Sequence, residues 1–145
     1  MEIPRRIINY SDLIDDIVNE LRESGDVSTD GLARTSTSEF TGRYIHIRKR
    51  GGFGGLLALD FVAWRKFGRS PIWLEFTSSE WGKAQEVTAS LSRTDLYLID
   101  LAECSERRGV GTPITLMPNT DKRKVIENCA VQIREVADIL LAGSA

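Results

Sequence analysis

The feature that most constrains the fold is a long apolar segment in the middle of the chain, GGLLALDFVAW at residues 54–64. Successive side chains of a strand point to opposite faces of a sheet, and here both sets are mostly apolar. The segment therefore predicts a strand that is more fully buried than its neighbours. A chain of 145 residues is long enough to build a core around such a strand without disulfides or a metal ion.

Helices are expected near both ends of the chain and once between them. Apolar residues recur at helical spacing over residues 11–24 and again over residues 121–142. The segment 78–91 opens with two serines that are suited to cap a helix.

Alternating or apolar runs predict five strands, over residues 43–50, 54–64, 71–77, 96–102 and 113–117. The element order is then α-β-β-β-α-β-β-α. A single α+β domain over residues 1–145, with a mixed, mostly antiparallel five-stranded sheet and helices packed on it, fits this order. The strand-helix-strand segment from residue 71 to residue 102 is expected to form a right-handed parallel crossover.

The glycine-rich stretch RKRGGFGG at residues 48–55 predicts the turn of a β-hairpin. A dinucleotide-binding loop needs a strand, the glycine pattern and then a helix, whereas LLALDF, which follows these glycines, is typical of a strand. Glycine supplies the positive φ angles that a short hairpin loop requires. The hairpin is also suited to binding, because Arg48, Lys49 and Arg50 beside an exposed Phe53 would contact a nucleic-acid backbone and stack on a base.

Charge is spread unevenly along a chain whose net charge is −2. Residues 1–40 carry a net −5, residues 41–69 a net +6 and residues 70–145 a net −3. A basic centre between acidic flanks is typical of a polyanion-binding surface. The alternative is that the acidic first helix packs near the basic segment and neutralises it.

Several kinds of chemistry are disfavoured by the residue types. His46 is the only histidine, which excludes a metal site built from several histidines, and its isoleucine neighbours indicate a structural role. Cys104 and Cys129 form no CxxC pair and are expected to be reduced thiols. No export signal is recognised at the N-terminus, and no apolar run approaches the roughly 18 residues that span a bilayer. We therefore expect a cytoplasmic protein that does not bind membranes.

Two carboxylates on neighbouring predicted strands resemble a nuclease motif. The order α-β-β-β-α-β is also the core order of the PD-(D/E)XK nuclease superfamily, in which an Asp on the second strand and a D/E-x-K on the third bind Mg²⁺. Asp60 and Glu75 match the acidic positions. The lysine position is Thr77, a departure that puts catalysis in doubt, and Lys83 is the conceivable substitute. The resemblance implies, as one alternative, a degenerate or active metal-dependent nuclease that uses Asp60, Glu75 and Lys83.

A second resemblance covers roughly residues 43–142. This part of the chain is similar to the C-terminal accessory region of some bacterial proteins of the PD-(D/E)XK superfamily, which carry an aromatic-x-x-W stretch, a short gap and then PLWL. The matching residues here are Phe61, Trp64, Pro71, Ile72, Trp73 and Leu74. This is a packing motif without catalytic residues, and the nuclease part that precedes it in those proteins has no counterpart here. The resemblance implies a stand-alone accessory or recognition domain.

The function that these observations favour is non-catalytic binding of nucleic acid or of an acidic protein, without a cofactor. The contact surface would combine the hairpin with the turn after the second strand. Its binding residues would be Arg48, Lys49, Arg50, Phe53, Arg65, Lys66 and Arg69. Besides the nuclease with its Mg²⁺, a third alternative is a small inhibitor- or immunity-type protein that caps a protein partner. Its contact surface would be the acidic first helix, with Asp12, Asp15, Asp16, Glu20 and Glu23. The oligomeric state stays open.

Overall fold

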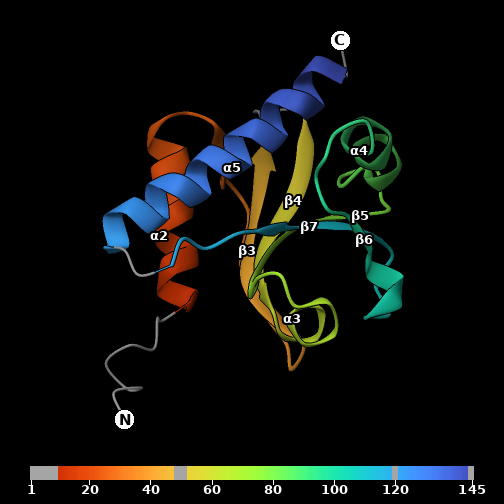
Figure 1. Cartoon of the computed structure of the whole chain (residues 1–145). Helices are drawn as coiled ribbons and strands as arrows, with labels where there is room; N and C mark the ends of the chain where they lie inside the picture. The colour runs from red at the N-terminus through yellow and green to blue at the C-terminus, as the bar shows by residue number, and fades with distance from the viewer. Residues whose placement is uncertain (1–9, 48–51, 119–120, 144–145) are drawn as a thin grey trace.

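The computed structural model describes residues 10–47, 52–118 and 121–143 (Figure 1). The fold is α+β, as the sequence predicts. Its helices are α2 (Tyr10–Glu23), α3 (Phe61–Phe67), α4 (Ala84–Leu91), the short 3₁₀ helix η1 (Leu101–Glu103) and α5 (Lys122–Gly143). Its strands are β1 (Val27–Ser28), β2 (Arg34–Ser36), β3 (Phe40–Ile47), β4 (Phe53–Asp60), β5 (Ile72–Thr77), β6 (Ile99–Asp100) and β7 (Gly109–Ile114).

The described strands form one seven-stranded sheet in the order β1-β3-β4-β5-β7-β6, with β2 also paired to β3. Every pair is antiparallel. β3 and β4 pair along their whole length, from Phe40 opposite Asp60 to Ile47 opposite Phe53, as expected for a hairpin. The residues 48–51 that connect them lie outside the described residues.

The main core lies between one face of the sheet and the helices α2 and α5, which cross that face in Figure 1. Leu57 of β4 and Leu74 of β5 are fully buried there against apolar residues of α2 and α5 such as Ile17 and Ile133. The opposite face of the sheet carries smaller clusters, one around Trp73 and one around Leu56. All eight residues of β4 are buried, so the predicted burial of this strand is confirmed.

The predicted strand at 54–64 is too long, because Asp60 ends it. Its Oδ1 accepts hydrogen bonds from the backbone N–H of Val62 at 3.1 Å and of Ala63 at 2.9 Å. Asp60 is thus the N-cap of α3, so the apolar residues that follow it continue as a helix. The two short strands β1 and β2 also differ from the prediction. Their polar residues pair with β3 without the apolar alternation that would reveal a strand.

The described sheet has seven strands with every pair antiparallel, rather than five strands in a mixed arrangement. β5 and β6 run parallel to each other, as the predicted crossover requires, but they do not pair directly. β7 lies between β5 and β6 and is antiparallel to both. The strand predicted at 113–117 corresponds to β7 but begins four residues too late, because the glycines of GVG at its start carry no apolar pattern. A side chain at Gly109 would bring its Cβ within 2.1 Å of the carbonyl oxygen of Phe76, so only glycine lets the two backbones approach here.

Trp81, which precedes α4, packs directly on Gly54 of β4. Its indole N–H donates to Nε2 of His46 at 3.3 Å, and its ring meets Tyr44 at a centroid distance of 5.7 Å. The backbone N–H of Gly54 donates to the carbonyl of Trp81 at 2.8 Å. His46 is therefore part of a packed aromatic cluster.

We predict that Gly54→Ala lowers the free energy of unfolding by about 1–3 kcal/mol, because a Cβ at Gly54 would lie 2.1 Å from the Trp81 ring and force it outward. Chemical denaturation followed by tryptophan fluorescence measures the change. The control is the same substitution in a Trp81→Ala background, where the extra methyl meets no ring and the loss should largely disappear. An equal loss in both backgrounds would contradict the packing role assigned to Gly54.

Candidate functional site

The two carboxylates singled out by the sequence do come together. Asp60 ends β4, Glu75 lies in β5, and each is 1% exposed on the sheet face away from α2 and α5. Arg107, from the segment between η1 and β7, bridges them. Its Nη1 lies 2.6 Å from Oε1 of Glu75, and its Nη2 lies 2.9 Å from Oδ2 of Asp60. We call these three residues the acidic pair and its arginine.

Packing fixes the guanidinium from several directions. Its carbon lies 4.1 Å from the centroid of the Phe40 ring, and its Nε donates to Oγ of Ser105 at 3.2 Å. Ser105 in turn donates to Oε1 of Glu39 at 3.4 Å. On the neighbouring strand Gly111 pairs with Glu75, and a Cβ at that position would be in ordinary van der Waals contact with the Cγ of the glutamate. The site is thus assembled from β3, β4, β5, β7 and the segment before β7.

The proton balance of the cluster follows from its burial. Burial raises the pKa of Glu75 well above its usual range, and hydrogen bonding with Asp60 adds to this, while Arg107 opposes it. Burial also tends to raise the pKa of Asp60, but hydrogen bonds with Glu75, with the Ala63 amide and with Arg107 outweigh it and lower that pKa. Oε2 of Glu75 is buried and has no hydrogen-bond partner among the described residues. A protonated Glu75 beside an ionised Asp60 leaves one negative charge to match the Arg107 guanidinium and makes the cluster of three neutral.

This geometry does not fit the Mg²⁺ site that the nuclease resemblance implies. The Arg107 guanidinium occupies the position between the carboxylates that a shared cation would need. The Thr77 hydroxyl is paired with that of Ser79 at 3.0 Å. Lys83 places its ammonium 5.3 Å from the ring centroid of Phe53, at the other end of β4 from Asp60. No three His, Cys, Asp or Glu side chains of the described residues are arranged to hold a metal ion.

Neither cysteine is activated as a nucleophile. Burial, followed by the charges of Asp60 and Glu75, raises the pKa of the Cys104 thiol to about 11. Burial alone raises the pKa of Cys129 to about 11. Both residues therefore stay protonated thiols near neutral pH, as free cysteines.

The predicted binding residues fall into three groups. Arg48, Lys49 and Arg50 lie outside the described residues. Phe53 is only 3% exposed, so the expectation of an exposed stacking group at this position is wrong. The reason is its position as the first residue of β4, where its side chain joins the core beneath the helices. Arg65, Lys66 and Arg69, by contrast, are all exposed.

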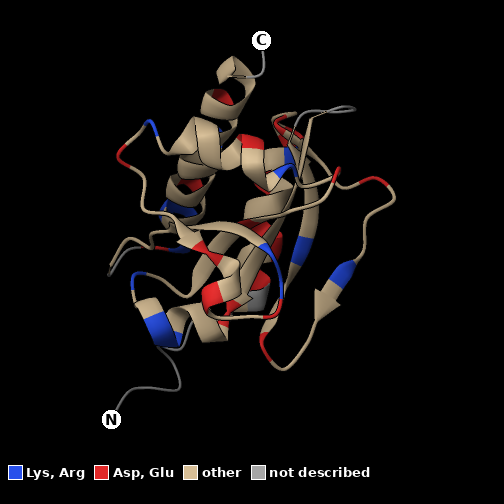
Figure 2. Cartoon of the chain, turned by 90° about the vertical axis from the view of Figure 1, so that its right-hand side faces the viewer, with Lys and Arg blue, Asp and Glu red and all other residues tan. Residues whose placement is uncertain are grey.

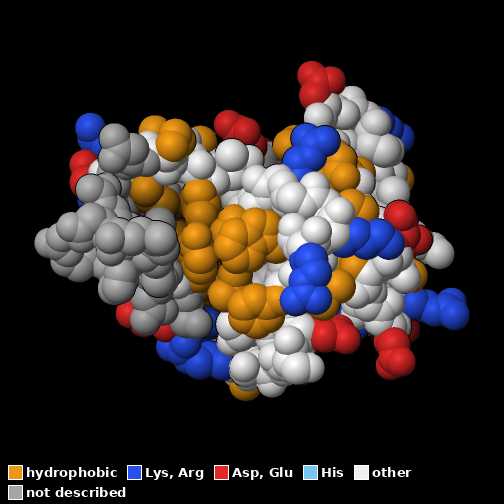
Figure 3. Space-filling view, turned by 60° about the horizontal axis from the view of Figure 1, so that its bottom comes forward, with side chains coloured by type: hydrophobic (Ala, Val, Ile, Leu, Met, Phe, Trp, Pro, Cys, Tyr) orange, Lys and Arg blue, Asp and Glu red, His pale blue; other side chains and the backbone are white. Residues whose placement is uncertain are grey.

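Two exposed aromatic rings accompany these cations on α3. Phe61 is 38% exposed and Trp64 is 41% exposed, and they follow each other at helical spacing. Trp64 is more exposed than Trp81, which is only partly exposed. We call Phe61, Trp64, Arg65, Lys66 and Arg69 the α3 surface. Figure 3 shows this side of the molecule, where hydrophobic side chains gather in a patch bordered by cationic ones.

The cations of the α3 surface differ in how they are held. Arg65 makes no hydrogen bond or ion pair with any residue that the structure describes. Lys66 donates to the backbone carbonyl of Glu103 at 2.5 Å, and the Arg69 guanidinium stacks 3.9 Å above the Tyr97 ring centroid. None of these three cations therefore forms an ion pair with an acidic side chain in the described part of the chain. Figure 2 marks the adjacent basic positions of α3 low in the molecule.

The acidic face of α2 pairs with cations from other elements. Asp15 binds Arg34 at 2.8 Å and Arg43 at 3.4 Å. The start of α5 supplies two further partners, Lys122 for Asp16 at 2.9 Å and Arg123 for Glu20 at 2.8 Å. Of the described cations in the basic segment 41–69, Arg43 alone forms an ion pair with α2, so these acids do not neutralise the α3 surface.

No family model, curated protein or solved structure matches this chain. None of the described helices is both long and apolar enough to cross a membrane. Only the geometry of the site therefore indicates a function.

The sequence did not reveal the role of Arg107, which sits in the polar segment ECSERRGVGT without any periodic pattern. One signal could have pointed to it. Two acidic residues inside predicted buried strands need a cation nearby for their burial to be tolerated. The adjacent arginines of ERR, just before the last strand, are candidates for that cation.

We predict that Arg107→Met lowers the free energy of unfolding by about 3–5 kcal/mol, because it leaves the buried acidic pair without its cation. Adding Asp60→Asn should recover part of this loss, since it removes the buried charge that Arg107 neutralised and keeps the helix cap. Urea denaturation measures both variants. The control is Arg93→Met, an exposed arginine elsewhere, which should change stability by no more than about 0.5 kcal/mol. A loss at Arg107 as small as at Arg93 would contradict the bridging role.

The raised pKa of Glu75 also predicts a pH dependence. Its folded pKa exceeds the ordinary value of 4.5, so its contribution to stability is complete below that pH and is lost as pH rises through the folded pKa. Asp60 acts in the opposite direction and matters only as pH falls below its ordinary 3.8. We expect Glu75→Gln to flatten the decline of the melting temperature between about pH 5 and about pH 8. Parallel thermal melts of the two proteins check this; identical slopes would show that Glu75 does not bind a proton on folding.

Proposed function

We propose that this protein is a non-catalytic nucleic-acid-binding domain and that the α3 surface is its contact site. The observation that carries the proposal is the presence of two exposed aromatic rings and three exposed cations on one short helix and the turn that follows it. A soluble domain gains nothing for its own stability from exposing Phe61 and Trp64 side by side.

The combination of residue types favours a single-stranded nucleic acid. Cations bind the phosphate backbone, and each base stacked on an aromatic ring adds about 1–3 kcal/mol without requiring a sequence. Tyr10 meets Trp64 edge-to-face at a centroid distance of 5.9 Å, which restrains the tryptophan ring before binding. Arg65, next to Trp64, has its guanidinium available for a phosphate.

An acidic protein is the rival ligand for the same surface. Charge alone would serve such a partner, and the two exposed rings would then have no specific role. The helix instead places its rings and its cations side by side, an arrangement that follows the alternation of base and phosphate in a single strand.

We expect a fluorescently labelled single-stranded DNA oligonucleotide to bind with an affinity that falls as salt rises, by about 0.7 log unit per log unit of salt for each phosphate contacted. Trp64→Ala should weaken binding by about tenfold, and Arg65→Gln should reduce the salt slope by about one phosphate contact. Fluorescence anisotropy titrations at several salt concentrations measure both effects.

The matched control carries Arg93→Gln and Lys124→Gln, two exposed cations away from α3, and should bind as the unaltered protein does. Poly-glutamate serves as the acidic-protein probe. If poly-glutamate binds while the oligonucleotide does not, or if Trp64→Ala has no effect, the nucleic-acid proposal is wrong.

The nuclease alternative is tested on the same samples with Mg²⁺ or Mn²⁺ and both plasmid and single-stranded substrates. We expect no cleavage, since Arg107 holds both carboxylates. Metal-dependent cleavage that disappears in Asp60→Asn would overturn the non-catalytic assignment.

A further inference from the structure

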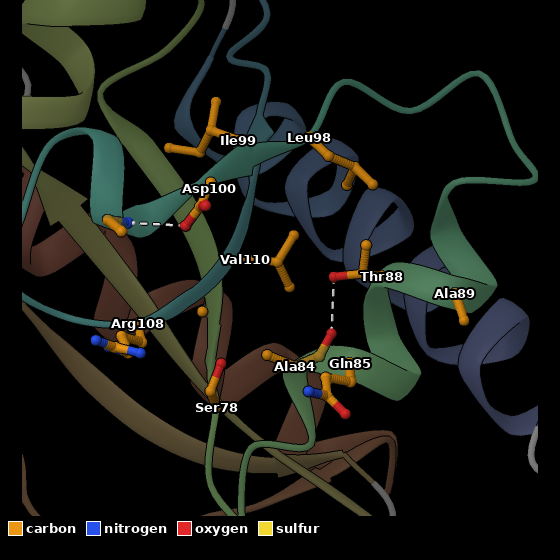
Figure 4. Close-up of a pocket in the computed structure, with 12 residues that line it drawn as sticks. Ser78, Ala84, Gln85, Thr88, Ala89, Leu98, Ile99, Asp100, Arg108 and Val110 are labelled. Atoms are coloured by element: carbon orange, nitrogen blue, oxygen red, sulfur yellow. Dashed lines mark hydrogen bonds between the residues drawn. The ribbon is translucent and has the colours of Figure 1, made fainter.

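A groove of about 760 Å³ lies between α4 and the sheet edge formed by β6 and β7 (Figure 4). Its volume lies in the range of about 300–1,000 Å³ that is typical of small-molecule sites. It involves no residue of the α3 surface or of the acidic pair and its arginine. The residues that line the groove include Ser78, Gln85, Ala89, Leu98, Arg108 and Val110.

The interior of the groove is apolar. Val110, on β7, points toward α4 in Figure 4, and Leu98 precedes β6 on the same side. Opposite them α4 presents Ala84 and Ala89, whose small side chains leave the space open. Val110 and Ala84 are already buried, so an apolar group placed here would cover mainly the partly exposed Leu98 and the exposed Ala89.

One charged donor at the rim has no partner. Arg108 is exposed and makes no side-chain hydrogen bond or ion pair with any described residue. Two other polar side chains of the lining already form hydrogen bonds within the protein. The Thr88 hydroxyl donates to the Ala84 carbonyl at 2.7 Å, and Oδ1 of Asp100 accepts from the Ala102 amide at 3.0 Å. The Asp100 carboxylate is the only acid in the described lining and would repel an anion, so an anionic group has to lie beside Arg108 and away from Asp100.

We infer that this groove binds a small molecule with an apolar body and a single anionic group. The apolar body lies between Val110, Leu98 and the alanines of α4, and the anionic group lies against Arg108. Ser78, whose backbone N–H donates to the Arg108 carbonyl at 2.9 Å, offers a hydroxyl beside that anion. This site is separate from the proposed nucleic-acid contact.

The probe that tests the inference is decanoate, added to the full-length protein labelled with ¹⁵N and followed by NMR chemical shifts. We expect saturable shifts confined to residues 78–89, 98–102 and 108–110. Decanol and decylamine share the ten-carbon alkyl chain of decanoate but lack its negative charge. Each should bind at least about tenfold more weakly than decanoate. Decyl phosphate separates the two kinds of anionic group.

Two variants address the two halves of the site. Arg108→Gln should weaken the binding of decanoate about tenfold and leave the binding of decanol unchanged, because it removes the positive charge and retains much of the side-chain shape. Ala89→Phe, at an exposed helix position, should fill the groove and abolish both. Arg93→Gln, an exposed arginine just after α4, is the control and should bind decanoate unchanged.

Shifts that do not saturate, shifts that map elsewhere, or decylamine binding as well as decanoate would overturn the inference. An unchanged affinity in Arg108→Gln would do the same, and this variant alters only an exposed side chain. Oligonucleotide binding, measured separately with Trp64→Ala, can fail or succeed without affecting this result, because the two sites share no residue.

Discussion

The interaction on which much of this structure depends is the bridge from Arg107 to the buried carboxylates of Asp60 and Glu75. Two acids beneath the surface of a sheet are tolerable only with a counter-charge and a place for the remaining proton. The guanidinium, stacked on Phe40, supplies the charge, and Glu75 keeps the proton. The bridge ties the segment before β7 to β4 and β5, so the covering of the second sheet face depends on it.

The same bridge separates this chain from the nuclease that its acids resemble. An acidic pair on adjacent strands is shared with that motif, but here the Arg107 guanidinium lies between the two carboxylates. The groups available to a ligand lie elsewhere. The α3 surface presents aromatic rings and cations to solvent, and the groove beside α4 presents an apolar interior with one arginine that pairs with no described residue.

The elements that the sequence predicts well are those with a strong apolar period, such as α5 and the doubly buried β4. It fails where polar or glycine residues adopt regular structure, because β7 uses glycines to approach β5 closely. The acidic pair is visible as a motif, whereas Arg107 is not, since 32 and 47 residues separate it from its partners. The sequence also shows that the basic segment contains aromatic residues. It does not show which of them are exposed, because Phe53 lies in a buried strand and Trp64 on an exposed helix face.

Asp60 carries two tasks on one side chain, with Oδ1 beginning α3 and Oδ2 holding Arg107. No other residue type can perform both. Asparagine would keep the cap without the charge, and glutamate would carry the charge on a longer arm that no longer reaches the helix amides. The orientation of the exposed helix is thereby mechanically linked to a proton-sharing cluster in the interior, so whatever disturbs one of them is felt by the other.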